Sequence, residues 1–239
     1  MRRAALFALL VLVAAAAPAP AAAPRLTVYA AASLAGVLPA IDSKQRYSVG
    51  GSDTLALQIR QGAPADVYAA ASPKYPDDLH AAGLVEKPVV FATNRLVLIV
   101  PASNPARIGD VFDLARPGVK LVIGQAGVPV GDYTRKVLAT LGLSSALANV
   151  VSEETDVKGV VAKVALGEAD AGIVYATDAL AARGQVKTLR LASWAQPPVK
   201  YEIAIVRSSH NLAAARAFVA KVLSRAGRAQ LKAAGFGPP

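Results

Sequence analysis

The sequence predicts an α/β protein with two lobes. Short β-favouring runs alternate with helical patterns over most of the 239 residues, an order typical of helices layered on mostly parallel sheets. Two of these runs, 96–100 and 201–206, are flanked by Pro101 and Pro198 and are interpreted as strands that cross between lobes. The chain is therefore expected to leave a first lobe, build a second and return, so that two connections form a hinge.

Each predicted element rests on a local pattern. Strands are predicted where β-branched and aromatic residues form short runs, at 26–29, 67–69, 96–100, 120–124, 171–175, 186–191 and 201–206. Helices are predicted where apolar residues recur at helical spacing, at 52–61, 76–82, 110–115, 131–141 and 157–166, with one or two more in 211–234. The first lobe is accordingly expected over 24–98 and 203–239, and the second over 99–202.

A secretory signal is expected in residues 1–23. The chain starts with a basic Met-Arg-Arg, continues with an apolar run at 4–17 that is too short to cross a bilayer, and then offers small-residue cleavage sites up to Pro24. A buried first helix is the alternative interpretation. The sequence contains no cysteine, so we expect an exported, soluble protein without disulfides and without an N-terminal lipid anchor.

The charge pattern argues against nucleic-acid binding. The formal net charge is +10, and two of these charges, Arg2 and Arg3, lie in the expected signal. The other basic residues are scattered, without a Lys/Arg run or an interleaved aromatic platform. A solvated basic surface is the simplest interpretation, and recruitment of a small anion is the alternative.

Enzyme chemistry finds little support in the residues. His80 and His210 are the only histidines, and neither lies near a Ser-x-Gly turn. The segment 50–54, Gly-Gly-Ser-Asp-Thr, lacks the closing glycine of a nucleophile elbow. Phosphate-loop and dinucleotide-binding motifs are missing, and two distant histidines without cysteine do not predict a zinc site. We expect no enzyme, no cofactor and no direct side-chain metal ligand, with a serine hydrolase as the less favoured class.

The junction VYAAASLAG, residues 28–36, introduces the feature that recurs along the chain. A strand ends at three alanines, and Ser33 opens a segment whose apolar residues return at helical spacing. Small side chains leave room against the backbone N–H groups that a helix start leaves unpaired.

Four predicted helix starts share this character, at Ser33, at Ser52, at Val130 and at Val157. Each start carries roughly half a positive charge, so four of them would supply about two positive charges if they converge. That would suit a dianion. Taken singly, each serine is explained as a plain helix cap, and Tyr175 as a buried aromatic at a strand end.

Six segments of the sequence resemble one family, in the family's order and over essentially the whole mature chain. They are 26–34 (LTVYAAASL), 52–56 (SDTLA), 62–66 (GAPAD), 128–131 (VPVG), 156–159 (DVKG) and 172–175 (GIVY). The family is that of the periplasmic molybdate-binding proteins of ABC importers. The resemblance implies a type II periplasmic-binding-protein fold, in which two lobes, each a mixed, mostly parallel sheet flanked by helices, close over a tetrahedral oxyanion.

The resemblance also implies a ligand shell, partners and a location. Ser33 and Ser52 would donate hydroxyl and backbone hydrogen bonds, Val130 and Val157 backbone N–H groups, and Tyr175 its hydroxyl. The expected ligand is molybdate or tungstate, and the expected partner is the membrane permease of an ABC importer. A monomer in the periplasm is expected.

Two departures from the family's pattern keep alternatives open. The segment between Ser33 and Ser52 is short, so the first helix, interrupted by Pro39, and the following strand are expected to be truncated. Asp53 follows Ser52, and a carboxylate facing the cavity would repel a dianion. We expect Asp53 to point outward in the first helical turn, where the helix dipole favours its charge. If it points inward, it could accept the proton of a hydrogen phosphate; sulfate is a further candidate.

Overall fold

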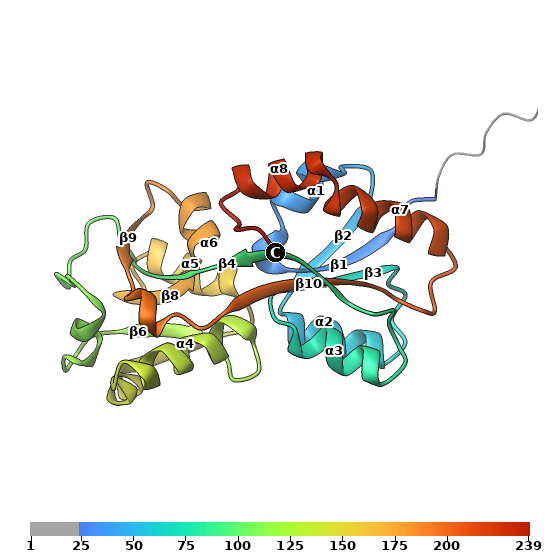
Figure 1. The fold of residues 1–239 in the computed structure, drawn as a ribbon. Helices are drawn as coiled ribbons and strands as arrows, with labels where there is room; N and C mark the ends of the chain where they lie inside the picture. The colour runs from blue at the N-terminus through green and yellow to red at the C-terminus, as the bar shows by residue number, and fades with distance from the viewer. Residues whose placement is uncertain (1–23) are drawn as a thin grey trace, which may run out of the picture.

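The structure is a computed structural model that describes residues 24–239; the expected signal at 1–23 lies outside the described residues. Two five-stranded sheets lie side by side, each covered by helices (Figure 1). Their strand orders are β2-β1-β3-β10-β4 and β7-β6-β8-β5-β9. We call the part around the first sheet the first lobe and the part around the second sheet the second lobe. None of the helices in residues 24–239 has the length and apolar character needed to cross a bilayer.

The first lobe combines the two ends of the described chain. Its strands are β1 (Thr27–Ala31), β2 (Arg46–Gly50), β3 (Val67–Ala70), β4 (Val89–Asn94) and β10 (Val199–Ile205). On one side of the sheet lie the 3₁₀ turn η1 (Ala32–Leu34) and helices α1 (Val37–Ile41), α7 (Leu212–Leu223) and α8 (Arg225–Ala233), and on the other α2 (Ser52–Arg60) and α3 (Lys74–Ala81) (Figure 1). β1 pairs in parallel with β2 and β3, whereas β10 runs antiparallel to β3 and β4.

The second lobe is built from the middle of the chain. Its strands are β5 (Leu96–Pro101), β6 (Leu121–Gly124), β7 (Val150–Glu154), β8 (Ala171–Tyr175) and β9 (Val186–Arg190). Its helices are α4 (Pro129–Thr140), α5 (Val157–Ala165) and α6 (Ala176–Ala181), with 3₁₀ turns η2 (Val111–Ala115), η3 (Ser144–Asn149) and η4 (Ser193–Ala195). β6 is parallel to β7 and β8, and β5 is antiparallel to β8 and β9.

The sheets are mixed as predicted, but parallel pairs make up only half of each. β5 and β10, the strands that follow the connections between the lobes, run antiparallel to both of their neighbours. A strand that arrives directly from the other lobe needs no crossover helix and is free to run against its neighbours. The strand–helix alternation in the sequence describes only the remaining strands, which do follow the parallel rule.

The crossings between lobes lie beside the predicted strands and not within them. Residues 96–100 lie in β5 of the second sheet, and residues 201–205 lie in β10 of the first sheet. The chain therefore changes lobe at Arg95 and again between β9 and β10. The side chain of Gln196 joins the two connections, because its Oε1 accepts from Leu96 N and its Nε2 donates to Leu96 O, each at 2.9 Å. The two connections, at which the sequence analysis expects a hinge, are thus joined by one side-chain amide.

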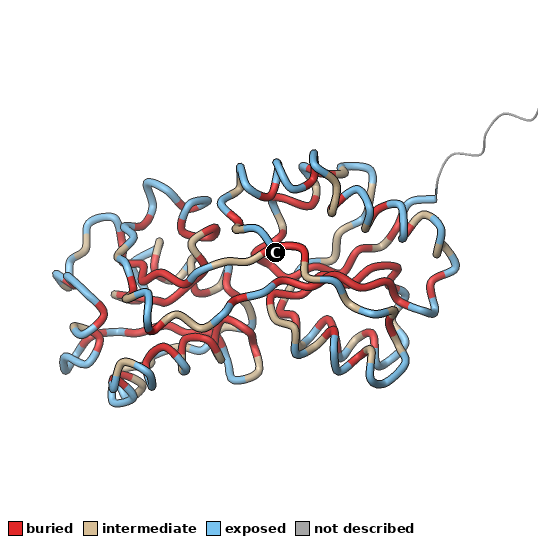
Figure 2. Tube along the Cα trace, in the orientation of Figure 1, coloured by how far each residue is buried: buried red, intermediate tan, exposed pale blue. Residues whose placement is uncertain are grey.

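Central and edge strands explain which elements the sequence predicted. β3 and β5 are buried at every position, and these strands form the red interior of Figure 2. Fully buried strands read as continuous apolar runs, so they were predicted. Of the four edge strands, β2, β4 and β7 carry polar or half-exposed residues, as in Val-Val-Ser-Glu-Glu at β7, and were not predicted, whereas β9 was predicted although it is mostly exposed.

One buried carboxylate holds the first lobe together. Asp66, just before β3, accepts from Thr27 N at 2.7 Å with Oδ2, and from Ser209 Oγ at 2.5 Å and Asn211 Nδ2 at 3.2 Å with Oδ1. It thus joins β1 to the segment that leads into α7. Because the two ends of the lobe are far apart in sequence, this cluster stabilises their association.

We predict that Asp66→Ala lowers the free energy of unfolding by about 3 kcal/mol, since it leaves a buried N–H and a hydroxyl without an acceptor. Urea unfolding followed by circular dichroism measures the change. The control is Asp78→Ala, whose carboxylate pairs with Lys74 at 2.9 Å on the surface and should cost less than about 1 kcal/mol. Equal effects of the two variants would contradict this role of Asp66.

Because the carboxyl of Glu202 on β10 is buried, we predict that the stability of the fold depends on pH. Burial, followed by the negative charge of Asp77, raises the pKa of this carboxyl from 4.5 to about 7. The folded protein therefore binds more protons than the unfolded chain between these values, and the contribution of Glu202 to stability falls as pH rises from about 4.5 to 7. Glu202→Gln should be as stable as the parent near pH 4.5 and more stable above pH 7. Thermal unfolding of both proteins across this range measures the difference, and a difference independent of pH would contradict the prediction.

Candidate functional site

A small cavity lies between the lobes, where strands of both sheets end. Its wall is formed by Ala31, Ala32, Ser33, Gly50, Gly51, Ser52 and Ala71 of the first lobe and by Val128, Pro129, Val130, Asp156, Val157 and Tyr175 of the second. These residues follow the carboxyl ends of β1, β2, β3, β6, β7 and β8. The cavity is narrow: the volume open to the centre of a water-sized sphere is about 10 Å³, far below the roughly 300–1,000 Å³ of pockets for drug-sized ligands. All five residues predicted for the ligand shell meet at this one cavity.

Ser33 reaches the cavity from η1 and not as a helix cap. The prediction that a helix starts at Ser33 is wrong, because Ser33 lies in η1 (Ala32–Leu34) and the α-helix begins only after Gly36. The expectation that this first helix is truncated is confirmed, since α1 has five residues and contains Pro39. The side chain is buried, and its Oγ lies 2.9 Å from the hydroxyl of Tyr201 on β10. This second hydroxyl fixes the orientation of Ser33.

Ser52 is the first residue of α2, and Gly51 precedes it as the cap residue. Its hydroxyl accepts a hydrogen bond from Ala71 N at 3.1 Å, and its carbonyl accepts one from Tyr68 Oη at 2.6 Å. Since the hydroxyl oxygen already accepts, its proton can be donated toward the cavity. Two contacts to β3 and the loop after it thus hold this serine in place.

The backbone of Val130 belongs to the first turn of α4. Pro129 occupies the first helical position and has no N–H, so Val130 supplies the first donor of the helix. Gly131 packs so closely on β6 that a Cβ there would lie 2.2 Å from the Gly124 carbonyl oxygen. This contact sets the start of α4, and with it the Val130 N–H, against the end of the strand.

Val157 begins α5, and Asp156 caps this helix. The Asp156 Oδ1 accepts from Lys158 N at 2.7 Å and from Gly159 N at 3.2 Å. These bonds satisfy the second and third N–H groups of the helix, so the first, that of Val157, is the donor left for the cavity. Asp156 lines the cavity as well, but its carboxylate is used in capping.

Tyr175 is the last residue of β8, and its hydroxyl is the notable polar group of this site. The side chain is 2% exposed, and its hydroxyl has no hydrogen-bond partner among the described residues. Burial, then the neighbouring Tyr201, raises the pKa of Tyr175 well above its ordinary value, so the hydroxyl remains protonated. Its ring packs edge-on against those of Tyr133 and Tyr201, with ring centres 6.5 and 5.8 Å from its own, and these contacts hold it in place. A buried O–H without an acceptor costs free energy, and a ligand oxygen in the cavity would supply the acceptor.

The cavity is lined by helix starts and not by cationic side chains. No lysine or arginine is among the described residues that line it, and three α-helices, α2, α4 and α5, begin at its wall. The four converging helix starts of the sequence analysis are thus three, since η1 is a single turn, and they supply about 1.5 positive charges. The donors come from both lobes.

Asp53 does not line the cavity. It lies in the first turn of α2, with Oδ2 at 3.4 Å from Thr54 Oγ1, but the carboxylate does not simply point outward as expected: Oδ1 turns back toward Gly51 of the cavity wall, where a Cβ would lie 2.6 Å from it. Its Oδ1 is buried and has no partner among the described residues. Asp53 therefore lies behind Gly51 and not on the cavity wall itself.

Other residues of the wall gave weaker signals in the sequence. The alanines before Ser33 and the glycines at 50 and 51 were noted as small residues, and the reason at Gly51 is now visible. A Cβ at Gly51 would lie 2.5 Å from the carbonyl oxygen of Thr155 in the other lobe, so the lobes approach backbone to backbone. Ala71 and the supporting Tyr201 were missed, because neither stands in a recognisable motif.

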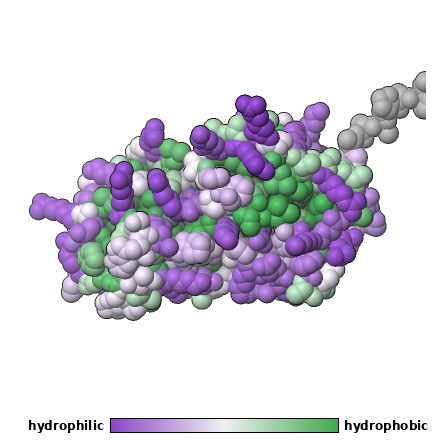
Figure 3. Space-filling view, in the orientation of Figure 1, coloured by the Kyte–Doolittle hydropathy of each residue, from purple (hydrophilic) through white to green (hydrophobic). Residues whose placement is uncertain are grey.

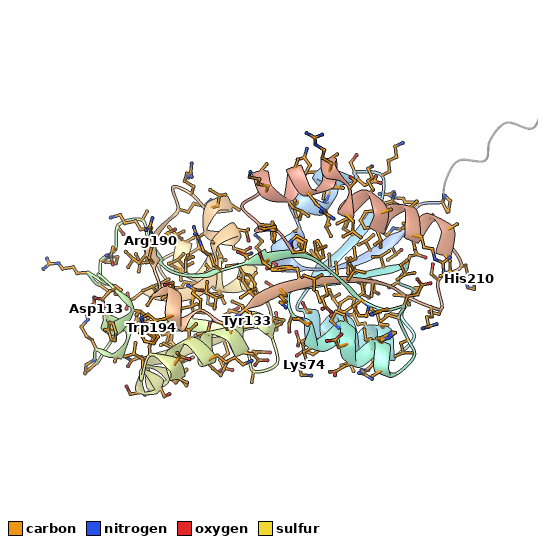
Figure 4. All side chains as sticks on the ribbon, viewed as in Figure 1. Lys74, Asp113, Tyr133, Arg190, Trp194 and His210 are labelled. Carbon is orange, nitrogen blue, oxygen red and sulfur yellow. The ribbon has the colours of Figure 1, made fainter. Side chains whose placement is uncertain are left out.

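Features expected of an enzyme are not found at the cavity. His80 contacts the Val85 carbonyl through Nδ1 at 3.1 Å, and His210 lies at the end of the first lobe far from the second (Figure 4). Within residues 24–239 no group of three or more His, Cys, Asp or Glu side chains is placed to hold a metal ion.

Hydrophilic residues are spread over the visible face of both lobes without one dominant patch (Figure 3).

Comparisons with known proteins agree with this geometry. The family model of bacterial extracellular solute-binding proteins matches residues 10–237. The molybdate-binding protein ModA of Mycobacterium tuberculosis is 38% identical over 224 residues, which cover 90% of this chain and 85% of that protein. ModA of Haemophilus influenzae is 33% identical over 242 residues, 94% of each chain.

A solved structure shows the same fold. The periplasmic molybdate-binding protein of Azotobacter vinelandii superposes on this structure with a TM-score of 0.81 and is 24% identical in sequence. The match covers 90% of this chain and 100% of that one. The two mixed sheets and the cavity between them are thus the architecture of a type II periplasmic binding protein. With a family model that spans nearly its whole length, the chain belongs to the bacterial extracellular solute-binding proteins.

Proposed function

We propose that this protein captures molybdate or tungstate in the cavity between its lobes and delivers it to the membrane permease of an ABC importer. The observation that carries the proposal is the Tyr175 hydroxyl, a buried donor without a partner among the described residues, at a cavity where three helices begin. The relatives named above bind molybdate, and they match this chain over most of its length.

The donor set suits a fully deprotonated oxyanion. Moving an isolated anion into a dry cavity costs tens of kcal/mol unless donors replace its water shell. The hydroxyls of Ser33, Ser52 and Tyr175 and the N–H groups of Val130 and Val157 supply such donors, and helix starts bind anions without lysine or arginine. An anion that accepts from every side needs no acceptor in return, and the one carboxylate on the cavity wall, that of Asp156, accepts from the first turn of α5.

Capture is a binding event coupled to closure and involves no covalent step. The first lobe supplies both serines, and the second supplies both N–H groups and the tyrosine. Only the closed arrangement brings all five onto one anion, so the anion stabilises the closed state through the contacts it makes there and not in the open state. The two-segment hinge at Arg95 and 191–198 allows this motion.

The alternatives from the sequence are less well supported. Phosphate would need Asp53 as a proton acceptor, and Asp53 lies outside the cavity wall. Sulfate needs the same donors as molybdate and is separated from it by direct comparison. A serine hydrolase would need a base beside Ser33 or Ser52, and neither His80 nor His210 lines the cavity.

The setting follows from the same proposal. We propose an exported protein of the periplasm that acts as a monomer and is not lipid-anchored, with the permease as its partner. The absence of cysteine from the sequence supports the lack of an N-terminal lipid anchor, and the family's extracellular character supports export.

The first test is thermal unfolding of residues 24–239 with molybdate, tungstate, sulfate and phosphate in turn. Molybdate and tungstate at about 100 times their dissociation constants should each add roughly 2.7 kcal/mol to the free energy of unfolding. Phosphate and sulfate at equal concentration should add much less. A midpoint raised by phosphate and not by molybdate would overturn the proposal.

The second test is Tyr175→Phe. Loss of a hydrogen bond to a charged ligand should weaken molybdate binding by about ten-fold or more in calorimetric titrations. The unliganded protein should not be destabilised, because the hydroxyl has no partner to lose. Tyr29→Phe, on β1 outside the cavity wall, is the control and should bind as the parent does. Unchanged affinity in Tyr175→Phe would remove this residue from the site.

A further inference from the structure

Two side-chain hydrogen bonds outside the cavity wall join the lobes: Asn94 Nδ2 donates to Thr177 Oγ1 at 2.9 Å, and Tyr75 donates to the loop before α4. The hydroxyl of Tyr75, the second residue of α3 in the first lobe, donates to the carbonyl oxygen of Gly127, in the loop before α4 of the second. Neither residue lines the cavity. Figure 4 labels Lys74, the neighbour of Tyr75, at the end of α3 nearest the second lobe, and Tyr133 on α4 across from it. This contact lies on the line along which the lobes meet.

The Tyr75 hydroxyl is a dependable donor. Burial, followed by the negative charges of Asp53, Asp132 and Asp78, raises its pKa to about 12, so it keeps its proton at any pH the protein meets. The Lys74 ammonium lies 4.6 Å from the centre of the Tyr75 ring and pairs with Asp78 at 2.9 Å. These contacts, all within α3, hold the ring where it is.

The acceptor is held just as firmly. Gly127 has a φ of +89°, a conformation that favours glycine, and its N–H donates to Asp132 Oδ1 at 2.9 Å. Val128, the next residue, donates to the Gln125 carbonyl at 3.2 Å and caps α4. The Gly127 carbonyl is therefore three residues from Val130, the proposed anion donor, within one constrained loop.

We infer that Tyr75 is a latch residue, whose hydrogen bond to Gly127 holds the closed state and slows release of the anion without touching it. This inference rests on the proposed function. When the lobes separate, the Tyr75 hydroxyl and the Gly127 carbonyl part and pair with water, so the bond contributes to the closed state alone. Because the acceptor moves with the loop that presents Val130, closing the latch also fixes a donor of the anion shell.

The experiment compares Tyr75→Phe with the parent, using labelled molybdate chased with excess unlabelled molybdate. Loss of one net hydrogen bond from the closed state should speed release by about 3- to 10-fold and weaken binding by the same factor, with the association rate unchanged. The unliganded protein should keep its unfolding midpoint, because there the hydroxyl is satisfied by water. Small-angle scattering of the liganded variant should show a larger open fraction at equal molybdate concentration.

The matched control is Tyr47→Phe. Tyr47 also donates its hydroxyl to backbone carbonyls, those of Leu38 at 3.0 Å and Asp42 at 2.6 Å, but entirely within the first lobe. This variant should lower the unfolding midpoint with and without molybdate and leave the release rate unchanged. Removing one tyrosine hydroxyl should thus lower the unfolding midpoint at residue 47 and raise the rate of molybdate release at residue 75.

Three results would overturn the latch. Release from Tyr75→Phe at the parental rate would show that the bond does not hold the closed state. A fall in the unliganded midpoint equal to that of Tyr47→Phe, with unchanged affinity, would make Tyr75 a structural residue only. If the parent binds none of molybdate, tungstate, sulfate and phosphate, the proposed function fails and the latch with it, whereas parental binding without an effect at Tyr75 overturns the latch alone.

Discussion

The structure depends on one constraint: helix starts and hydroxyl-bearing residues from two separate sheets must come together around one small cavity that no Lys or Arg side chain among the described residues lines. Three helix starts and the buried Tyr175 hydroxyl meet this constraint because they follow the carboxyl ends of parallel strands, which lie together at the cleft. The strand order of each lobe, the glycines against which helices pack and the capping by Asp156 all serve to hold these donors in place.

Much of this arrangement was predictable from local patterns. Central strands such as β5 are continuous apolar runs and were predicted from that pattern. The helix starts at Ser52, Val130 and Val157 follow a glycine, a proline and a capping aspartate, and these residues indicated where the helices begin. The ligand shell as a set came from the family resemblance, and the structure adds that its members meet at one cavity. Val130 and Val157 have no polar side chain, so spacing alone would not have singled them out.

What could not be predicted depends on contacts between distant segments. The edge strands β2, β4 and β7 each pair with one neighbour only, and their half-exposed sequences carry a weaker strand pattern than the central strands do. Ser33 lies in a 3₁₀ turn because Gly36 and Pro39 shorten the helix, and its partner Tyr201 is 168 residues away. The lobe crossings fall outside the predicted strands for the same reason, since only sheet pairing decides to which lobe a strand belongs.

The close approach of Gly51 to the Thr155 carbonyl has a consequence for selectivity by size. Main-chain atoms meet there, with less space than one methyl group requires, so at this point the approach of the lobes is limited by the paths of two loops and not by side chains. Exchanging side chains in such a site can alter how strongly an ion is held, but accepting an ion of a different radius requires the loops themselves to lengthen or shorten. Relatives that transport smaller or larger oxyanions should therefore differ from this chain by insertions and deletions at these loops more than by substitutions in the wall.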